Sequence, residues 1–152
     1  MKKSGVTLIE IVIVMALVSL MVGVVDSMLI SYLKNYKNNV LENKGFNYLN
    51  EAIAIIEKEV NEDANIVKTE ENIIKINYSN GTTINHIKCI KGNLYILYGT
   101  KYSIPVDSSN KSVIIDEVKE FVATRTGRTL YIKVIWCNGQ TIERCLAIKN
   151  AN

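Results

Sequence analysis

The feature that most constrains the fold of this chain is an uncharged apolar run near its N-terminus. The 15 residues from Ile11 to Val25 contain no charge and only two residues that are not apolar. The run lies within residues 6–30, where 19 of the 25 residues are hydrophobic. A membrane-spanning helix needs about 20 residues, so the run alone is too short, whereas residues 6–30 are long enough. The wider segment includes Glu10 and Asp26, and a carboxylate at membrane depth is costly, which makes it a candidate functional group.

The rest of the chain has the composition of a folded domain. The 152 residues are 48% hydrophobic and 22% charged, which excludes a disordered or collagen-like chain. The formal net charge of +3 is too small to indicate nucleic-acid binding by itself. Lys2 and Lys3 before an apolar stretch would also suit a Sec signal peptide, but no small-x-small cleavage site follows the run. We therefore expect an apolar N-terminal segment joined to a soluble body.

The residues before the run carry a resemblance to a known family. Residues 2–10 read Lys-Lys-Ser-Gly-Val-Thr-Leu-Ile-Glu and lead directly into the apolar run. This arrangement resembles the class III leader of type IV prepilins and pseudopilins. In that family a basic leader ends in Gly, a prepilin peptidase cuts after it on the cytoplasmic side, and the new N-terminal residue is methylated.

The resemblance implies a role for each matching residue. Gly5 is the last residue of the leader, Val6 is the methylated N-terminus of the mature chain, and Glu10 is the glutamate used in assembly. The processing motif is completed by Thr7, Leu8 and Ile9, the most frequent triplet of the family at these positions. Val6 departs from the pattern, because Phe is usual there.

The spacing of Val6 and Glu10 has a chemical rationale. Cleavage would leave a positive amine at Val6, and Glu10 lies four residues further on, about one helical turn along the same face. Pairing Glu10 with the amine of a neighbouring subunit would offset the cost of both charges in lipid. Pairing within one subunit competes with this arrangement, so the assembly role follows from the resemblance and not from the spacing.

A helix is predicted to continue beyond the apolar run. From Met28 to Val60 there is no proline, and apolar residues recur at helical spacing until acidic residues gather near residue 62. A single helix over residues 6–62 would be about 85 Å long, too long for a remainder of about 90 residues to bury. Its first half must therefore contact lipid or sister helices, while its second half packs on the body.

The body is predicted to be built from antiparallel strands. A hairpin turn at Asn80 and Gly81 pairs Ile74 with Ile87, and a second turn at Gly92 and Asn93 pairs residue 91 with residue 94. Both turns place apolar side chains on one face, which predicts a three-stranded meander. Further short strands are expected at residues 102–105, 112–115 and 121–124.

The last strands allow two registers. Leu130, Ile132, Val134 and Trp136 form an apolar face, and a two-residue turn would set this face against mostly polar residues. A three-residue loop over residues 138–140 sets it instead against Ile142, Leu146 and Ile148, which we prefer because it buries apolar surface. The predicted fold is α+β and pilin-like: a leader (1–5), a transmembrane or filament-core helix (6–30), an amphipathic helix packing on the head (31–62) and an antiparallel β head (63–152).

The cysteines, the single histidine and the charges suggest little further chemistry. A disulfide between Cys89 and either Cys137 or Cys145 is one interpretation, and three small buried apolar side chains is the other. His86 points away from the apolar face of the meander and is expected to be an exposed strand histidine. No zinc spacing, paired carboxylates, nucleophile motif or phosphate loop is found, so neither a metal, a cofactor nor an enzymatic activity is expected.

The most probable role implied by the resemblance is that of a minor subunit of a type IV pilus or pilus-like filament. The alternatives are a pseudopilin of a type II secretion or competence DNA-uptake system and, in another class, a stand-alone membrane-anchored binding domain. The expected partners are other pilins, the prepilin peptidase, the inner-membrane assembly platform and membrane lipid. Residues 51–71 carry a net charge of −5 and residues 72–152 one of +6, which leaves DNA binding open but weakly supported. The chain is expected in the cytoplasmic membrane as a single-pass protein with an extracytoplasmic head, and at the cell surface or in a filament after assembly.

Overall fold

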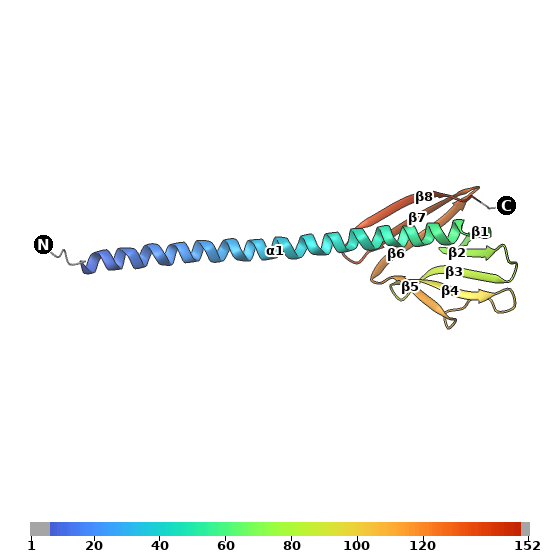
Figure 1. The fold of residues 1–152 in the computed structure, drawn as a ribbon, viewed down its shortest axis with the longest axis horizontal. Helices are drawn as coiled ribbons and strands as arrows, with labels where there is room; N and C mark the ends of the chain where they lie inside the picture. The colour runs from blue at the N-terminus through green and yellow to red at the C-terminus, as the bar shows by residue number, and fades with distance from the viewer. Residues whose placement is uncertain (1–6, 150–152) are drawn as a thin grey trace. The chain divides into compact units, whose positions relative to one another are not determined.

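The computed structural model describes residues 7–149 and contains one long helix followed by eight strands. The chain divides into two compact units, Met1–Leu41 and Glu42–Asn152, which are described separately below. Helix α1 (Leu8–Asn61) contributes residues to both units. Its end at Asn61 confirms the predicted boundary near residues 60–62 (Figure 1).

In the first unit, every described residue of α1 is exposed. An 18-residue window of α1 has a mean hydropathy of 2.8, and none of that window is buried. Its large apolar side chains, from Leu8 to Leu41, are all exposed. By length and composition, α1 can cross a membrane.

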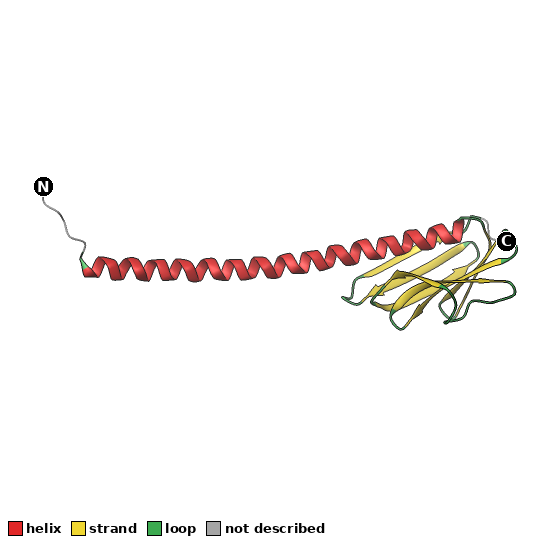
Figure 2. Cartoon of the chain, turned by 60° about the horizontal axis from the view of Figure 1, so that its bottom comes forward, coloured by secondary structure: helices red, strands yellow, loops and turns green. Residues whose placement is uncertain are grey.

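The second unit holds the end of α1 and two antiparallel sheets (Figure 2). The five-stranded sheet has the order β1 (Ala64–Glu70), β2 (Ile73–Tyr78), β3 (Thr83–Ile90), β4 (Asn93–Thr100) and β5 (Lys111–Ile115). The three-stranded sheet has the order β6 (Val118–Thr126), β7 (Thr129–Trp136) and β8 (Thr141–Ala147). The long helix and small antiparallel sheets make an α+β, pilin-like architecture, as the sequence predicts.

A single core joins α1 to both sheets. Within α1, burial begins at Gly45 and continues on one face through Leu49, Ala52, Ile53, Ile56 and Val60. This face packs against buried residues of both sheets: Val67, Ile74, Ile76, Ile87, Leu94, Leu130, Ile132, Val134 and Trp136. Alternate side chains of the strands face this core, which explains the alternation of apolar and polar residues in the sequence.

The predicted meander is confirmed in part, with one error of register. Ile74 pairs with Ile87, as the first turn predicts. The second turn is centred on Lys91 and Gly92 instead of Gly92 and Asn93, so that Ile90 pairs with Asn93. Both central residues have positive φ, 50° and 79°, the geometry of the tightest hairpin turn. Because the slip moves the pairing by two positions, the apolar face of the meander is unchanged.

The last hairpin has the predicted buried face and a shifted loop. Trp136 donates its N–H to the Gln140 carbonyl at 2.9 Å, so the three-residue loop is 137–139 and not 138–140. Val134 therefore lies opposite Ile142, and Leu130 lies opposite Leu146. Gly139 takes a φ of 88° in this loop, which favours glycine there.

Candidate functional site

The N-terminal end of α1 is organised by Thr7 and Glu10. The Thr7 carbonyl accepts the first helical bonds, from the N–H of Glu10 at 3.0 Å and of Ile11 at 3.4 Å. The Glu10 carboxylate reaches back, and its Oε2 accepts hydrogen bonds from the Thr7 N–H at 2.8 Å and the Thr7 hydroxyl at 3.0 Å. A threonine followed three residues later by a glutamate is the sequence pattern of a capping box, and it could have been noticed in the sequence.

This geometry leaves Glu10 able to take a further partner. Its charge lies at the helix N-terminus, where the helix dipole stabilises an anion. Among residues 7–149, only Thr7 donates hydrogen bonds to the Glu10 side chain, and both go to Oε2. The other oxygen, Oε1, accepts no hydrogen bond from residues 7–149 and has lone pairs for a further donor. Gly5 and Val6, the residues of the predicted cleavage site, lie outside the described part of the chain.

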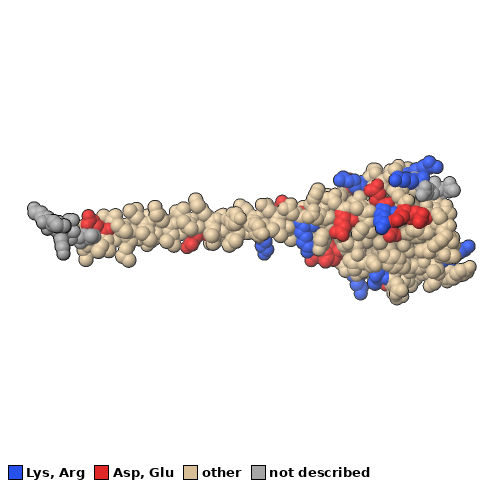
Figure 3. Space-filling model, viewed as in Figure 1, with Lys and Arg blue, Asp and Glu red and all other residues tan. Residues whose placement is uncertain are grey.

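The surface of α1 beyond Glu10 suits an apolar environment. The hydroxyls of Ser19 and Ser27 donate to the carbonyls of Met15 and Val24, both at 2.8 Å, so neither needs water. From Leu20 to Val25 the side chains are apolar and exposed, Asp26 is the one charge between the two serines, and Figure 3 shows few charged side chains along this part of the helix. An apolar helix surface of this kind is stable only in lipid or against other apolar helices.

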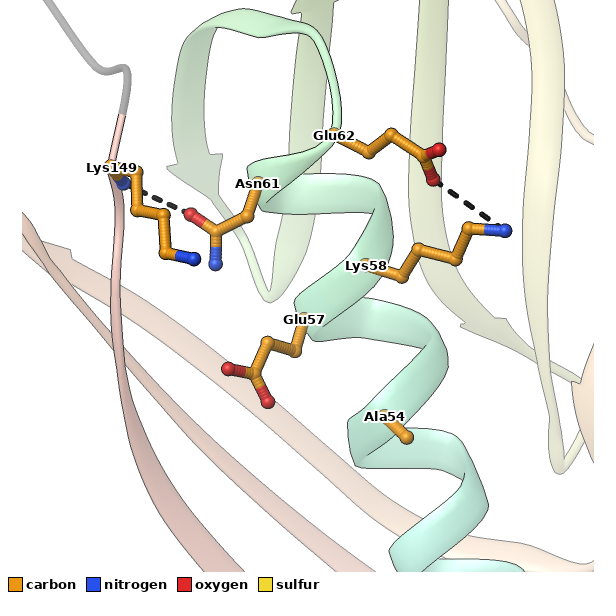
Figure 4. Close-up of a pocket in the computed structure, with 6 residues that line it drawn as sticks. All are labelled: Ala54, Glu57, Lys58, Asn61, Glu62 and Lys149. Carbon is orange, nitrogen blue, oxygen red and sulfur yellow. Dashed lines mark hydrogen bonds and ion pairs between the residues drawn. The ribbon is translucent and has the colours of Figure 1, made fainter.

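A cavity of about 470 Å³ in the second unit is a shallow groove along the end of α1, lined mostly by charged residues (Figure 4). Its lining residues are Ala54, Glu57, Lys58, Asn61, Glu62 and Lys149. Lys58 pairs with Glu62 at 3.5 Å, and the Asn61 side-chain oxygen accepts the backbone N–H of Lys149 at 2.9 Å. The bond between Asn61 and Lys149 joins the end of α1 to the chain after β8. None of the six lining residues is a nucleophile with a base beside it.

The three cysteines are free thiols in the structure. Cys89 is half-buried beside the core, whereas Cys137 and Cys145 are exposed, which corrects the interpretation of three buried side chains. The Cys137 thiol donates to the Glu117 carboxylate at 3.4 Å, and desolvation together with that carboxylate raises the pKa of Cys137. The disulfide between Cys89 and either Cys137 or Cys145 stays a prediction.

His86 points away from the core, as predicted, but the expectation that it is exposed is wrong. Only 8% of its surface is accessible, because the loop after β4 covers it and the Pro105 carbonyl accepts its ring N–H. No cluster of three or more His, Cys, Asp or Glu residues that could hold a metal ion occurs between residues 7 and 149.

Comparison with known families identifies the N-terminal segment. Residues 1–25 match the family model of the prokaryotic N-terminal methylation motif, the leader of type IV prepilins. No curated protein matches the chain. The motif therefore indicates a prepilin of the type IV pilin and pseudopilin class, and the pilin-like architecture agrees with it.

This class fixes several coarse properties. The leader implies processing by a prepilin peptidase and assembly with other pilins. The apolar helix that follows it suits anchoring in a membrane. The motif is that of structural subunits, which in general are not enzymes.

Proposed function

We propose that this chain is a minor subunit of a type IV pilus or pilus-like filament. The observation that carries the proposal is the methylation motif at residues 1–25, followed at once by an exposed apolar helix whose first turn holds Glu10. Each large apolar side chain left in water would cost roughly 1.5–3 kcal/mol, so this helix needs lipid before assembly and sister helices afterwards.

The processing steps follow from the motif. The prepilin peptidase cuts between Gly5 and Val6, and the new amine at Val6 is methylated. The cut removes Lys2 and Lys3, and the leader that carries them stays on the cytoplasmic side of the membrane, as in the prepilin family. The β head lies on the extracytoplasmic side, and the inner-membrane assembly platform then moves the subunit out of the lipid into the filament.

Glu10 sets the position of each subunit relative to its neighbour. The Thr7 contacts occupy Oε2 and hold the carboxylate at the helix end, and Oε1 would accept from the amine of Val6 in an adjacent subunit. Two charges that are each costly in an apolar core become favourable as a pair. A subunit that lacks the carboxylate leaves its neighbour's amine unpaired, which disfavours its entry into the filament.

The proposal predicts that Glu10→Ala is processed and held in the membrane but is incorporated poorly into filaments. The measurement is the ratio of this subunit in the sheared filament fraction to that in the membrane fraction, by immunoblot. We expect a drop of about tenfold or more, the equivalent of about 1.4 kcal/mol.

Asp26→Ala is the matched control, because it removes the other carboxylate of the apolar segment, which makes no capping contact. Asp26→Ala should enter filaments as the wild type does. Normal incorporation of Glu10→Ala would show that the glutamate is not used in assembly. If a cell produces this chain but its filaments contain none of it, the result would favour the stand-alone anchored domain.

A further inference from the structure

The five-stranded sheet carries a cavity on the face that points away from α1. Its volume is about 210 Å³, and six of its lining residues come in two rows across β1, β2 and β3. One row is Lys68, Lys75 and His86, and the next is Ile66, Asn77 and Ile84, with neighbours paired across the strands. Ile104, from the loop after β4, completes the wall. The cavity is therefore apolar on one side and cationic on the other.

The cationic row is unfavourable without an anion beside it. Lys68 lies directly opposite Lys75, and like charges opposite each other destabilise a pair of strands. Lys75 has one acid partner, Glu70, with which it forms an ion pair at the edge of the cavity. Lys68 forms no ion pair with any residue between 7 and 149. No carboxylate lines the cavity itself.

His86 reports on the charge in this cavity. Burial, and then the nearby ammonium groups of Lys75 and Lys88, lower its pKa, against the opposing effect of its bond to the Pro105 carbonyl. On β4 it faces the uncharged Leu97, and the Asp107 carboxylate on the loop is paired with Lys88. Burial first, and then the surplus of positive charge, favour the neutral ring, and a bound anion would counter the second of these effects.

The wall of the cavity is built in advance. Gly99 lets Pro105 approach so closely that a Cβ at residue 99 would lie 2.6 Å from the proline Cδ. The Lys101 N–H donates to the Thr82 carbonyl at 2.8 Å, which ties the loop to the turn before β3. Ile104 is therefore held over the sheet, and the cavity does not have to form on binding.

We propose that this cavity binds a carboxylate carried on an apolar group, with Lys68 and Lys75 around the acid and the isoleucines around the apolar body. A cavity of about 150 Å³ holds benzene, so one of this volume can hold a ring with a short acid side chain. Free aryl or alkyl carboxylates and the C-terminal residue of a peptide share this chemistry. The inference rests on the β sheet alone and does not depend on the proposed filament role.

The test uses the full chain, untagged, in phosphatidylcholine nanodiscs with ¹³C-labelled histidine. Because the sequence has a single histidine, every labelled ring signal comes from His86. Phenylacetate should shift these signals saturably with a Kd below about 10 mM, while 2-phenylethanol and acetate bind about tenfold more weakly. Bound phenylacetate should also raise the pKa of His86, since a negative charge stabilises the imidazolium.

Variants of Lys75 and of its partner Glu70 should change the affinity for phenylacetate in opposite directions. Lys75→Gln should weaken phenylacetate binding about tenfold, and Glu70→Gln should tighten it about threefold by freeing the Lys75 ammonium. Lys133→Gln is the matched control, since Lys133 is a comparably exposed strand lysine, with 31% accessibility against 35% for Lys75, paired with Glu143 on the other sheet.

Two peptides show whether the cavity accepts the C-terminus of a peptide as well as free small acids. Binding of acetyl-Gly-Phe with a free carboxylate, but not of its amide, extends the class to peptide C-termini, while binding of phenylacetate alone restricts it to small acids. Equal binding of 2-phenylethanol, no saturable shift of the His86 signals, or unchanged affinity in folded Lys75→Gln would overturn the proposal.

Discussion

Gly45 is where α1 first becomes buried, and it leaves room for two side chains of the β7–β8 hairpin. A Cβ there would lie 1.9 Å from the Gln140 Oε1 and 2.6 Å from the Trp136 Cε3. Gln140 can swing away, at the cost of its 3.0 Å bond to the Glu42 carbonyl. Trp136 cannot move as easily, because it is fully buried and its Nε1 donates to the Asp116 carbonyl at 3.1 Å.

We therefore predict that Gly45→Ala lowers the free energy of unfolding of the head by up to about 2 kcal/mol. Overpacking costs about 1–3 kcal/mol, and the better helix propensity of alanine returns about 1. The fluorescence of Trp136, the single tryptophan, follows denaturant unfolding of the full chain. Gly23→Ala is the control, since nothing lies within 4 Å of a Cβ there, and it should not destabilise the head.

His86 makes the stability of the head depend on pH. Its pKa is lowered in the folded protein, first by burial, so the unfolded chain binds a proton that the folded chain does not. The free energy of unfolding should therefore fall as the pH drops below about 6.5, by at most about 1.4 kcal/mol per pH unit from this group.

The comparison of the wild type with His86→Gln isolates this contribution. The variant should show a shallower loss of stability between about pH 7 and pH 5, because its side chain takes up no proton in either state. Parallel curves for the two proteins would show that the histidine is not held neutral by the fold. The same tryptophan signal serves as the readout.

At the scale of elements, the two sheets are joined along a seam between β1 and β6. The N–H of Arg125 donates to the Thr69 hydroxyl at 2.9 Å, and the N–H of Ala123 donates to the Asn72 side chain at 3.4 Å. The Arg125 guanidinium also donates to the Val67 carbonyl. The first two bonds satisfy backbone N–H groups of the β6 edge, and the third satisfies a carbonyl of the β1 edge.

Removing one acceptor should weaken this seam. Thr69→Val keeps the shape of the side chain but leaves the Arg125 N–H without its partner, which should cost about 1–2 kcal/mol of unfolding free energy. Thr129→Val is the control, because Thr129 is an exposed strand residue whose hydroxyl makes no hydrogen bond with residues 7–149. Equal stability of Thr69→Val and the wild type would mean that water replaces the lost bond.

The elements that could be predicted from the sequence are those with strong local signals. The Asn80–Gly81 signal predicts the register of β2 and β3 correctly, because Gly81 takes a φ of 70° and the Asn80 side-chain oxygen accepts the N–H groups of Thr82 and Thr83. Strand β1 was missed, since its turn is made by Glu71 and Asn72, with φ of 49° and 61°, and glutamate is not a turn signal. The register error at the turn between β3 and β4 has the same origin, because Lys91 takes a φ of 50° and lysine is not a turn signal either.

The burial of His86 could not be predicted for a different reason. The alternation of β3 places the residue on the correct face, but its cover comes from the loop after β4, whose path depends on tertiary contacts at Gly99 and Pro105. The capping contact of Thr7 with Glu10 is local and was within reach of the sequence. The contact between Thr69 and Arg125 could not be predicted, because it joins segments that are distant in the sequence.

At the scale of the whole molecule, the chain combines two kinds of surface. The helix surface from Ile11 to Val25 is exposed and apolar, while residues 42–149 bury a core shared by helix and sheets. An exposed apolar helix surface of this kind is not stable in water. The methylation-motif leader explains it, since such a leader precedes a helix that lies in a membrane or a filament. The central claim is therefore that the chain is processed as a prepilin.

The most direct test of that claim is the N-terminal mass of the protein purified from membranes of cells that contain a prepilin peptidase. Peptide mass spectrometry should find a chain that begins at Val6 and carries one methyl group on its amine. Gly5→Leu should leave the leader attached and serves as the control for the cut. Intact Met1 in the wild-type protein, or a cut near residue 26, would contradict the account.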